Sequence, residues 1–198
     1  MLITQLKRNK GDIMSNIEIR KAEIKDAYAV EYVAAHSWKE TYTGLMPDDY
    51  LDERIRTIKD KVPRAEKFIS EHNNYYVVEV DNQVIGILYF GKPPKQEYKE
   101  YGYLEAIYVL KAYHGLGIGK ELFKLSVQKL IEMGYKKMYL ECLKGNIAIE
   151  FYKKYLGKET KIVDFPIKDF SVKVDIVEFD NLSLVLNEIN KVSHKVKE

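Results

Sequence analysis

The stretch HGLGIGKE at residues 114–121 joins two segments with different periodicities. The run YGYLEAIYVL over 101–110 is mostly apolar and predicts a long strand, whereas the apolar spacing over 117–133 predicts a helix that Gly134 ends. Glycines at a strand-to-helix junction let the backbone approach a ligand closely. The N–H groups of the first helical turn, together with the helix dipole, then form an anion site, most often for phosphate. The turn therefore predicts a ligand that carries phosphate.

Two common phosphate-binding loops do not fit this spacing. A Walker loop needs a glycine five residues before its Gly-Lys pair and a Ser or Thr after it, and His114 and Glu121 hold these positions. A dinucleotide fingerprint that starts at Gly115 ends on Lys120 instead of glycine. Both a nucleotide-triphosphate loop and a dinucleotide fold are therefore excluded.

The chain on either side of this turn alternates between strand and helix patterns. The order predicts an α/β fold with a central sheet of about seven strands and helices on both faces. Asp81-Asn82 is a strong hairpin signal. The predicted strands are 17–21, the hairpin 73–92, 101–110, 136–143 and two strands within 158–187, and the predicted helices are 25–43, 48–60, a helix restarted by Pro63 that reaches about residue 71, 117–133 and 146–155.

The ends of the chain differ from the middle. Residues 1–15 are polar and aperiodic and predict a flexible N-terminal extension; an ordered arm, or a functional start at Met14, are the alternatives. Residues 16–187 are expected to form one domain, and 188–198 a charged C-terminal tail.

Composition narrows the function classes. The chain has 198 residues, 32 basic and 30 acidic side chains and a net charge of +2, so it lacks the net field that holds nucleic acid. Cys142 is the single cysteine, which excludes an internal disulfide and favours a reducing, cytoplasmic location. We expect no metal site from the four histidines and no membrane association, because no apolar run approaches about 20 residues.

The turn also fits the pattern Gln/Arg-x-x-Gly-x-Gly/Ala, read here as H-G-L-G-I-G after E-A-I-Y-V. This pattern resembles the acetyl-CoA motif of the GNAT superfamily of N-acetyltransferases. The segment ECLKGNIAIEFYKKYLGK (141–158) is similar to the second motif of that family, and HSWKETYTGLMPDDYL (36–51) resembles the acceptor-side helices of PaiA-type polyamine acetyltransferases. The resemblance covers about 17–187 and implies a mostly antiparallel twisted sheet of about seven strands that splays after its fourth strand. His114 departs from the usual Gln or Arg, and Asn146 precedes Tyr152 by six residues where seven is commoner.

The resemblance implies acetyl-CoA as co-substrate and no metal. It places the pyrophosphate on the main-chain N–H groups of the turn, and the pantetheine arm along the open edge of strand 104–109. A solvated first-turn lysine is the alternative for Lys120, and Gly145 is the alternative for Asn146. The cofactor-binding residues that the resemblance implies are Ile107, Tyr108, Val109, His114, Gly115, Leu116, Gly117, Ile118, Gly119, Lys120 and Asn146.

In this family an amine attacks the thioester directly, and a backbone N–H near 107–109 stabilises the oxyanion. An alkylamine has a pKa of about 10.4, so its neutralisation at pH 7 costs about 4.6 kcal/mol and a nearby carboxylate helps. Glu105 is the candidate base, with an exposed or ion-paired strand glutamate as the alternative. Tyr152 is the implied proton donor to the thiolate, with a packed aromatic as the alternative.

The expected activity is transfer of acetyl to the primary amine of a small molecule, polyamine or amino-acid-like. A non-catalytic acetyl-CoA sensor and a protein N-terminal or lysine acetyltransferase remain alternatives. The last strands could also pair across a homodimer. Cys142 is expected to be buried and inert, and Trp38 to be core. His36 and Tyr42 either contact the acceptor or pack within the fold. The acidic cluster of Asp48, Asp49, Asp52 and Glu53 either attracts a polycation or faces water.

Overall fold

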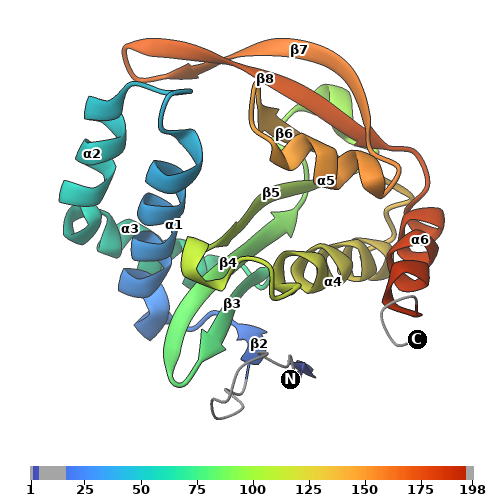
Figure 1. The fold of residues 1–198 in the computed structure, drawn as a ribbon, viewed down its shortest axis with the longest axis horizontal. Coiled ribbons are helices and arrows are strands. Elements are labelled where there is room, and N and C mark those ends of the chain that lie inside the picture. Colours follow the sequence, from blue (N-terminus) through green and yellow to red (C-terminus); the bar gives the residue numbers. More distant parts are fainter. Residues whose placement is uncertain (1, 5–16, 195–198) are drawn as a thin grey trace. The chain divides into compact units, whose positions relative to one another are not determined.

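The protein is an α/β chain, seen here in a computed structural model that describes residues 2–4 and 17–194 (Figure 1). The strands are hydrogen-bonded in the order β1-β2-β3-β4-β5-β6-β8-β7. The β5–β6 pair is parallel, whereas β1–β2, β2–β3, β3–β4, β6–β8 and β7–β8 are antiparallel, which confirms the predicted fold class.

The strands are β1 (Leu2–Thr4), β2 (Ile17–Lys21), β3 (Tyr75–Val80), β4 (Gln83–Gly91), β5 (Tyr101–Val109), β6 (Lys137–Leu143), β7 (Lys158–Ile167) and β8 (Phe170–Phe179). The α-helices are α1 (Ala27–Tyr42), α2 (Asp48–Arg56), α3 (Ile58–Glu71), α4 (Ile118–Glu132), α5 (Ala148–Lys154) and α6 (Leu182–His194). Three short 3-10 turns are η1 (Ile24–Asp26), η2 (Gln96–Tyr98) and η3 (Lys111–Tyr113).

Two compact units divide the chain, the first comprising 1–89 and 106–122 and the second 90–105 and 123–198. Strand β5 and helix α4 contribute residues to both units. Of the extension predicted over 1–15, residues 2–4 pair with β2 as strand β1, and the others lie outside the described residues. The predicted boundaries of extension, domain and tail stay predictions.

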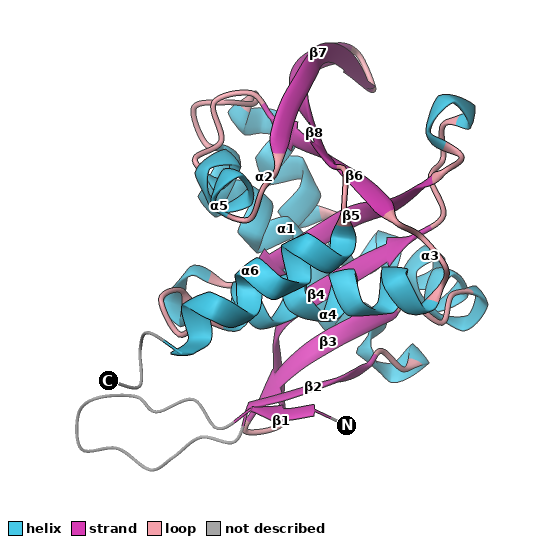
Figure 2. Cartoon of the chain, turned by 90° about the vertical axis from the view of Figure 1, so that its right-hand side faces the viewer, coloured by secondary structure: helices cyan, strands magenta, loops and turns pink. Residues whose placement is uncertain are grey.

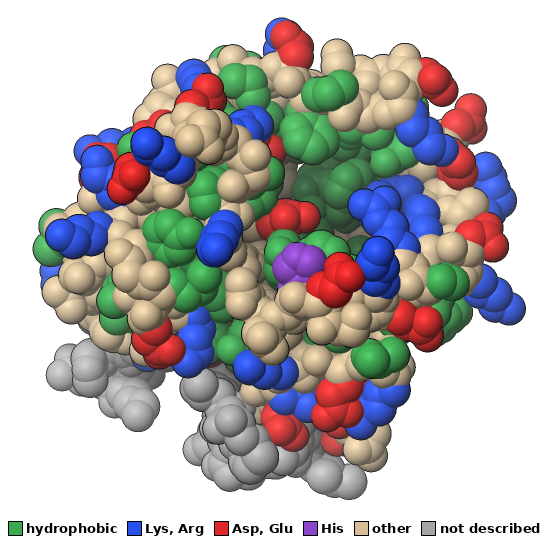
Figure 3. Space-filling model, turned by 180° about the vertical axis from the view of Figure 1, so that it is seen from behind, with side chains coloured by type: hydrophobic (Ala, Val, Ile, Leu, Met, Phe, Trp, Pro, Cys, Tyr) green, Lys and Arg blue, Asp and Glu red, His purple; other side chains and the backbone are tan. Residues whose placement is uncertain are grey.

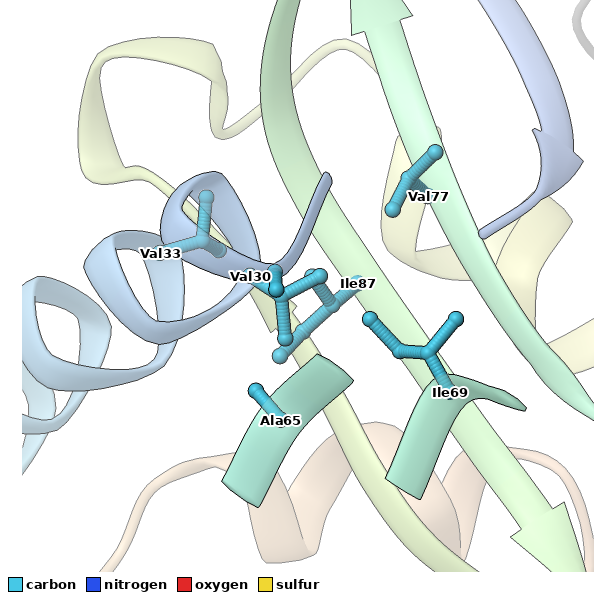
Figure 4. Packing of buried hydrophobic residues seen from close by; sticks show 7 residues of the cluster. Val30, Val33, Ala65, Ile69, Val77 and Ile87 are labelled. Atoms are coloured by element: carbon cyan, nitrogen blue, oxygen red, sulfur yellow. The ribbon is translucent and has the colours of Figure 1, made fainter. Parts of the chain in front are cut away.

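The core of the first unit lies between helices α1 and α3 and strands β3 and β4 (Figure 4). Apolar residues recur at helical spacing on α1 and α3, and they meet the inward face of the hairpin. Burying a side chain of this size stabilises the fold by roughly 1.5–3 kcal/mol. The labelled residues are Val30, Val33, Ala65, Ile69, Val77 and Ile87, each at most 7% exposed.

The β3–β4 hairpin turns at Asp81 and Asn82, as predicted. Both residues have positive φ, 50° and 63°, which is the conformation of a two-residue turn that matches strand twist. Asp and Asn tolerate this conformation better than most residues. The turn is therefore a local property of two residues, and the sequence was sufficient to predict it.

The helical segment after Met46 breaks earlier than predicted. The sequence predicted one helix over 48–60 and a restart at Pro63, whereas α2 ends at Arg56 and Pro63 lies inside α3. The break lies at Thr57, whose φ of −99° and ψ of 16° depart from helical values and whose Oγ1 donates to the carbonyl of Glu53 at 2.8 Å. Pro63 lies beyond the first turn of α3 and therefore removes one main-chain hydrogen bond from the helix.

In the second unit, β7 and β8 form a long hairpin and β8 pairs with β6 (Figure 2). The parallel β5–β6 ladder runs from the Tyr101–Lys137 pair to the Leu104–Leu140 pair and stops there. Gly102 allows α4 to approach the sheet, since a Cβ at this residue would lie 2.6 Å from Leu130 Cδ2. The face of β5 that holds Gly102 therefore packs against α4.

The prediction that the last strand continues to residue 187 is wrong. Strand β8 ends at Phe179, and α6 runs from Leu182 to His194. Leu182, Val185 and Ile189 are at most 1% exposed, at helical spacing that the preceding strand pattern obscured. Asn181 caps the helix, because its Oδ1 accepts the N–H of Leu184 at 3.1 Å.

Candidate active site

The glycine turn before α4 has the backbone that its sequence requires. Gly115 and Gly117 both have φ of 79°, and a Cβ at either would meet no atom within 4 Å. These glycines are needed for their left-handed conformation and not because the turn is crowded. Ile118 is 2% exposed and anchors the start of α4, while His114, Gly115 and Gly117 are exposed.

The main-chain N–H groups of this turn fall into two sets. Those of Lys120 and Glu121 donate to the carbonyl of Gly117, at 3.1 and 3.2 Å. Those of Ile118 and Gly119 are the first of α4, and a helix supplies no acceptor for its first N–H groups. Of the main-chain amides of 116–120, to which the resemblance assigns the anion, that of Lys120 therefore has an acceptor within the turn. The assignment of the anion to these amides stays a prediction.

His114 is held against the end of β5. Its Nε2 donates to the carbonyl of Val109 at 2.8 Å, so this nitrogen is engaged within the protein. The N–H of Lys111 donates to Glu40 Oε2 at 3.0 Å, which ties η3 to α1 in the same unit. The predicted contact between the His114 side chain and phosphate stays a prediction.

Strand residues Ile107, Tyr108 and Val109 are half-buried. Tyr108 Oη lies 3.5 Å from Tyr42 Oη, and its ring centre lies 6.4 Å from that of Trp38. The end of β5 therefore packs into the first unit through Tyr108.

The structure also shows the surroundings of the α1 residues whose roles the sequence left undecided. Trp38 is half-buried and not part of the buried core that the sequence predicted for it, and the Arg54 guanidinium lies 3.9 Å from the centre of its ring. Tyr42 is 8% exposed. His36 stacks on Tyr32 at 4.0 Å between ring centres.

The acidic cluster at the start of α2 is partly neutralised. Lys39 Nζ contacts Asp48 at 3.2 Å and Asp52 at 2.9 Å. Two of the four carboxylates that the sequence offered to a polycation therefore already have a cation. This arrangement favours the solvated-face alternative.

Tyr152 lies on α5 among aromatic rings of the second unit. Its ring centre is 5.7 Å from that of Phe123 and 6.5 Å from that of Phe179. Its side chain is half-buried, so packing holds the ring while part of the residue stays accessible.

Asn146 serves the start of α5. Its Oδ1 accepts the N–H of Ala148 at 2.9 Å, and its own N–H donates to the carbonyl of Leu143 at 2.9 Å. The residue is 8% exposed, whereas the neighbouring Gly145 is exposed and has φ of 89°. The side-chain oxygen of Asn146 thus has a structural partner, and its contact with a cofactor stays a prediction.

Glu105 lies where the β5–β6 ladder ends, and its side chain is exposed. Alternation along the strand puts it on the face of Tyr103, opposite the face of Gly102 and α4. Tyr152 contacts Phe123 of α4, so it belongs to the helix side of the same sheet. The two proposed proton-transfer residues therefore lie on opposite faces within the second unit.

Cys142 is 4% exposed, as expected. Burial, followed by the nearby Asp175 and Glu159 carboxylates, raises the pKa of its thiol to about 11. Such a thiol stays protonated at neutral pH and is a poor nucleophile.

Sequence reasoning missed a second group of residues on the Glu105 face. Tyr139 is completely buried and stacks on Tyr98 and Tyr103, at 4.0 and 4.8 Å between ring centres. Lys95 pairs with Glu141, two residues further along β6. Burial and then the Glu141 charge raise the pKa of the Tyr139 phenol well above its ordinary range. The alternation of KMYLECL was a visible signal, but the partner strand was needed to place these side chains.

Acidic and basic side chains are interspersed over the face shown in Figure 3. Across residues 2–4 and 17–194, no helix combines the length and apolar character that a membrane crossing requires.

Within those same ranges, no three His, Cys, Asp or Glu side chains gather as a metal site would require.

Comparison with known proteins decides the family. A model of the acetyltransferase (GNAT) family matches residues 33–157, more than half of the chain. The chain belongs to this family. It is a GNAT-type N-acetyltransferase, which confirms the resemblance seen around the glycine turn.

Three relatives illustrate the likeness. The N-acetyltransferase YuaI of Bacillus subtilis, described as uncharacterized, is 26% identical over 177 residues, 88% of this chain and 99% of that protein. The spermidine N(1)-acetyltransferase of Thermoplasma acidophilum is 27% identical over 148 residues, 70% of this chain and 86% of that protein. The crystal structure of PaiA N-acetyltransferase from Thermoplasma acidophilum in complex with coenzyme A has a TM-score of 0.63 at 24% identity. It covers 83% of this chain and 98% of that one, and it shows that the two share a fold.

Proposed function

We propose that this acetyltransferase uses acetyl-CoA as co-substrate and transfers the acetyl group to the primary amine of a small molecule. The observation that carries the proposal is the turn in which Gly115 and Gly117 both have φ of 79° immediately before α4. Such a turn aims main-chain N–H groups at an anion, and the diphosphate of coenzyme A is an anion of that kind. The N–H groups of Leu116–Gly119 would hold it.

The relatives support both halves of the proposal. The PaiA structure of Thermoplasma acidophilum contains coenzyme A, and the spermidine N(1)-acetyltransferase of that organism is named for a small amine. The fold of this chain is similar to that of the PaiA structure. Its sequence aligns with 86% of the length of the spermidine N(1)-acetyltransferase. We therefore expect this chain to bind coenzyme A through the glycine turn and to acetylate a small amine.

Starting from an ammonium, the chemistry removes two protons from the nitrogen and supplies one to the sulfur. Glu105 would take the first proton, directly or through water, as the amine nitrogen bonds to the acetyl carbon. Tyr152 would donate its phenolic proton to the sulfur as the carbon–sulfur bond breaks, and the tyrosinate would then take the second proton from the nitrogen as the amide forms. A main-chain N–H near 107–109 would stabilise the oxyanion that forms between these two events. The opposite faces on which Glu105 and Tyr152 lie suit a base and an acid that act on opposite sides of one carbonyl group.

Acetyl-CoA-dependent thiol release, measured over a panel of polyamines, alkylamines and amino acids, tests the proposal. We expect turnover with at least one small primary amine and none without amine. Binding of coenzyme A without turnover of any amine would instead indicate a sensor. Turnover only with peptides would indicate a protein acetyltransferase.

A further inference from the structure

The segment that joins β5 to the glycine turn is anchored before the turn begins. The N–H of Leu110 donates to the carbonyl of Ile85 on β4 at 2.9 Å, and the Leu110 side chain packs against the core of the first unit. The N–H of His114 donates to the carbonyl of Lys111 at 3.0 Å and closes η3. Because η3 leads directly into the glycine turn, its orientation sets the direction in which the turn begins.

One N–H group of η3 is bound by a side chain from a distant part of the chain. Lys111 is the first residue of η3, and a helical turn supplies no acceptor for its first N–H. Glu40, 71 residues earlier on α1, supplies the acceptor, because its Oε2 lies 3.0 Å from the Lys111 nitrogen. Glu40 is exposed, and among the described residues this is the only hydrogen bond or ion pair of its side chain. Its carboxylate is therefore committed to the start of η3.

A second side chain holds the other end of η3. The Nε2 of His114 donates to the carbonyl of Val109 at 2.8 Å, so the imidazole spans η3 and returns to the end of β5. The glycine turn that follows has open surroundings, since a Cβ at Gly115 or Gly117 would meet no atom within 4 Å. Packing at these two glycines therefore does not hold the turn, and its orientation depends on the segment that precedes it.

We propose that Glu40 is a positioning residue for coenzyme A: its carboxylate fixes η3, and η3 aims the N–H groups of the glycine turn at the diphosphate. The inference rests on the proposed function, because it concerns the cofactor that the turn would hold. A turn that is already held in the binding orientation loses less conformational freedom when its ligand binds. The negative charge of Glu40, by contrast, opposes the binding of an anion. The two effects have opposite signs, so substitutions can separate them.

Titration calorimetry with coenzyme A provides that separation. Glu40→Ala removes both the hydrogen bond and the charge, and we expect the dissociation constant to rise about fivefold, which corresponds to the loss of one helix-capping bond. Glu40→Gln removes the charge and keeps a side-chain oxygen for the Lys111 N–H, so its dissociation constant should equal or fall below that of the unaltered protein. An unchanged or lower value in Glu40→Ala would overturn the inference, and so would equal rises in the two variants.

Glu66→Ala is the matched control for the loss of a charge. Glu66 is exposed on α3 of the same unit, and its side chain makes no hydrogen bond or ion pair with the described residues. Its removal changes the net charge by the same amount as Glu40→Ala, and we expect an unchanged dissociation constant. A rise in Glu66→Ala as large as that in Glu40→Ala would overturn the positioning role.

Amide NMR of the coenzyme-free protein tests the role of Glu40 without any ligand. In Glu40→Ala we expect the signals of Lys111 and of the amides of 116–119 to move, whereas in Glu40→Gln those of 116–119 should stay close to their original positions. Changes confined to the neighbours of Lys111, with the glycine turn unaffected, would overturn the inference. Failure of the unaltered protein to bind coenzyme A would overturn the proposed function instead, and these spectra would still report whether Glu40 orients the turn.

Discussion

Gly117 illustrates how a single residue can carry a binding function without touching a neighbour. Its φ of 79° is costly for any residue with a Cβ, although the space around that position is open. An alanine there pulls the backbone toward negative φ and turns the adjacent N–H groups away from their common direction. The loss is therefore one of geometry in the turn and not of contacts.

We expect Gly117→Ala to weaken coenzyme A binding by about tenfold, equivalent to about 1.4 kcal/mol, as titration calorimetry would measure. Gly134→Ala is the matched control, because Gly134 has φ of 91° and equally open surroundings beyond the end of α4. It should lose comparable stability and keep its affinity for coenzyme A. Equal affinities in the two variants would contradict the assignment of the turn.

Tyr152→Phe separates chemistry from packing. The ring contacts with Phe123 and Phe179 persist in the variant, whereas the proton donor is lost. We expect turnover to fall by about 10²-fold, with the dissociation constant of coenzyme A unchanged. Tyr155→Phe, at the residue just after α5 and 2% exposed, should keep its turnover. Turnover that survives in Tyr152→Phe would make Tyr152 a packed aromatic only.

Asp26 makes the first unit sensitive to acid. Burial alone raises its pKa, but hydrogen bonds from Arg20 at 2.6 and 2.9 Å and from the Glu23 N–H outweigh burial and hold the pKa below 3.8. A carboxyl group whose pKa is lower in the folded state than in the unfolded state stabilises the fold. This stabilisation is complete at a pH above the unfolded-state pKa and is lost as the pH falls through the folded-state pKa. Asp26→Asn should therefore lower the free energy of unfolding by about 1–3 kcal/mol at pH 7.

Urea unfolding at pH 7 and at pH 3 checks this expectation. The difference between Asp26→Asn and the unaltered protein should shrink at the lower pH, because protonation removes the charge that the substitution removes. A difference that is equal at both values would exclude an ionised Asp26 as its source.

At the scale of elements, features that depend on a few adjacent residues could be predicted from the sequence, whereas features that depend on residues far apart in the chain could not. The glycine turn and the Asp81-Asn82 hairpin were found because each depends on a few adjacent residues. Helix α6 was missed because the alternating pattern of β8 runs directly into its first residues. The position of Tyr139 and Glu141 beside Glu105 depends on the register of two strands 36 residues apart in the Tyr101–Lys137 pair. No pattern within either strand specifies that register.

Helix α6 depends on its cap. The Asn181 side chain accepts the N–H of Leu184, so Asn181→Ala should lower the free energy of unfolding by about 1 kcal/mol, measured with urea. Asn181→Ser keeps an oxygen at the cap and should retain most of that stability. Equal losses in the alanine and serine variants would exclude capping as the cause.

At the scale of the whole chain, the proposed functions are divided between the two compact units. The first contains the glycine turn, and the second contains Glu105 and Tyr152. The net charge of +2 gives neither a strong attraction for nucleic acid nor a strong repulsion of an amine. Recognition of both substrates therefore depends on local groups and not on the overall field.

Amide NMR of the protein during a coenzyme A titration tests the role of the turn most directly. We expect the largest shifts at the N–H groups of Leu116, Gly117, Ile118 and Gly119, because they would hold the diphosphate. Shifts that saturate elsewhere while these four amides stay unchanged would contradict main-chain binding of the co-substrate by the turn.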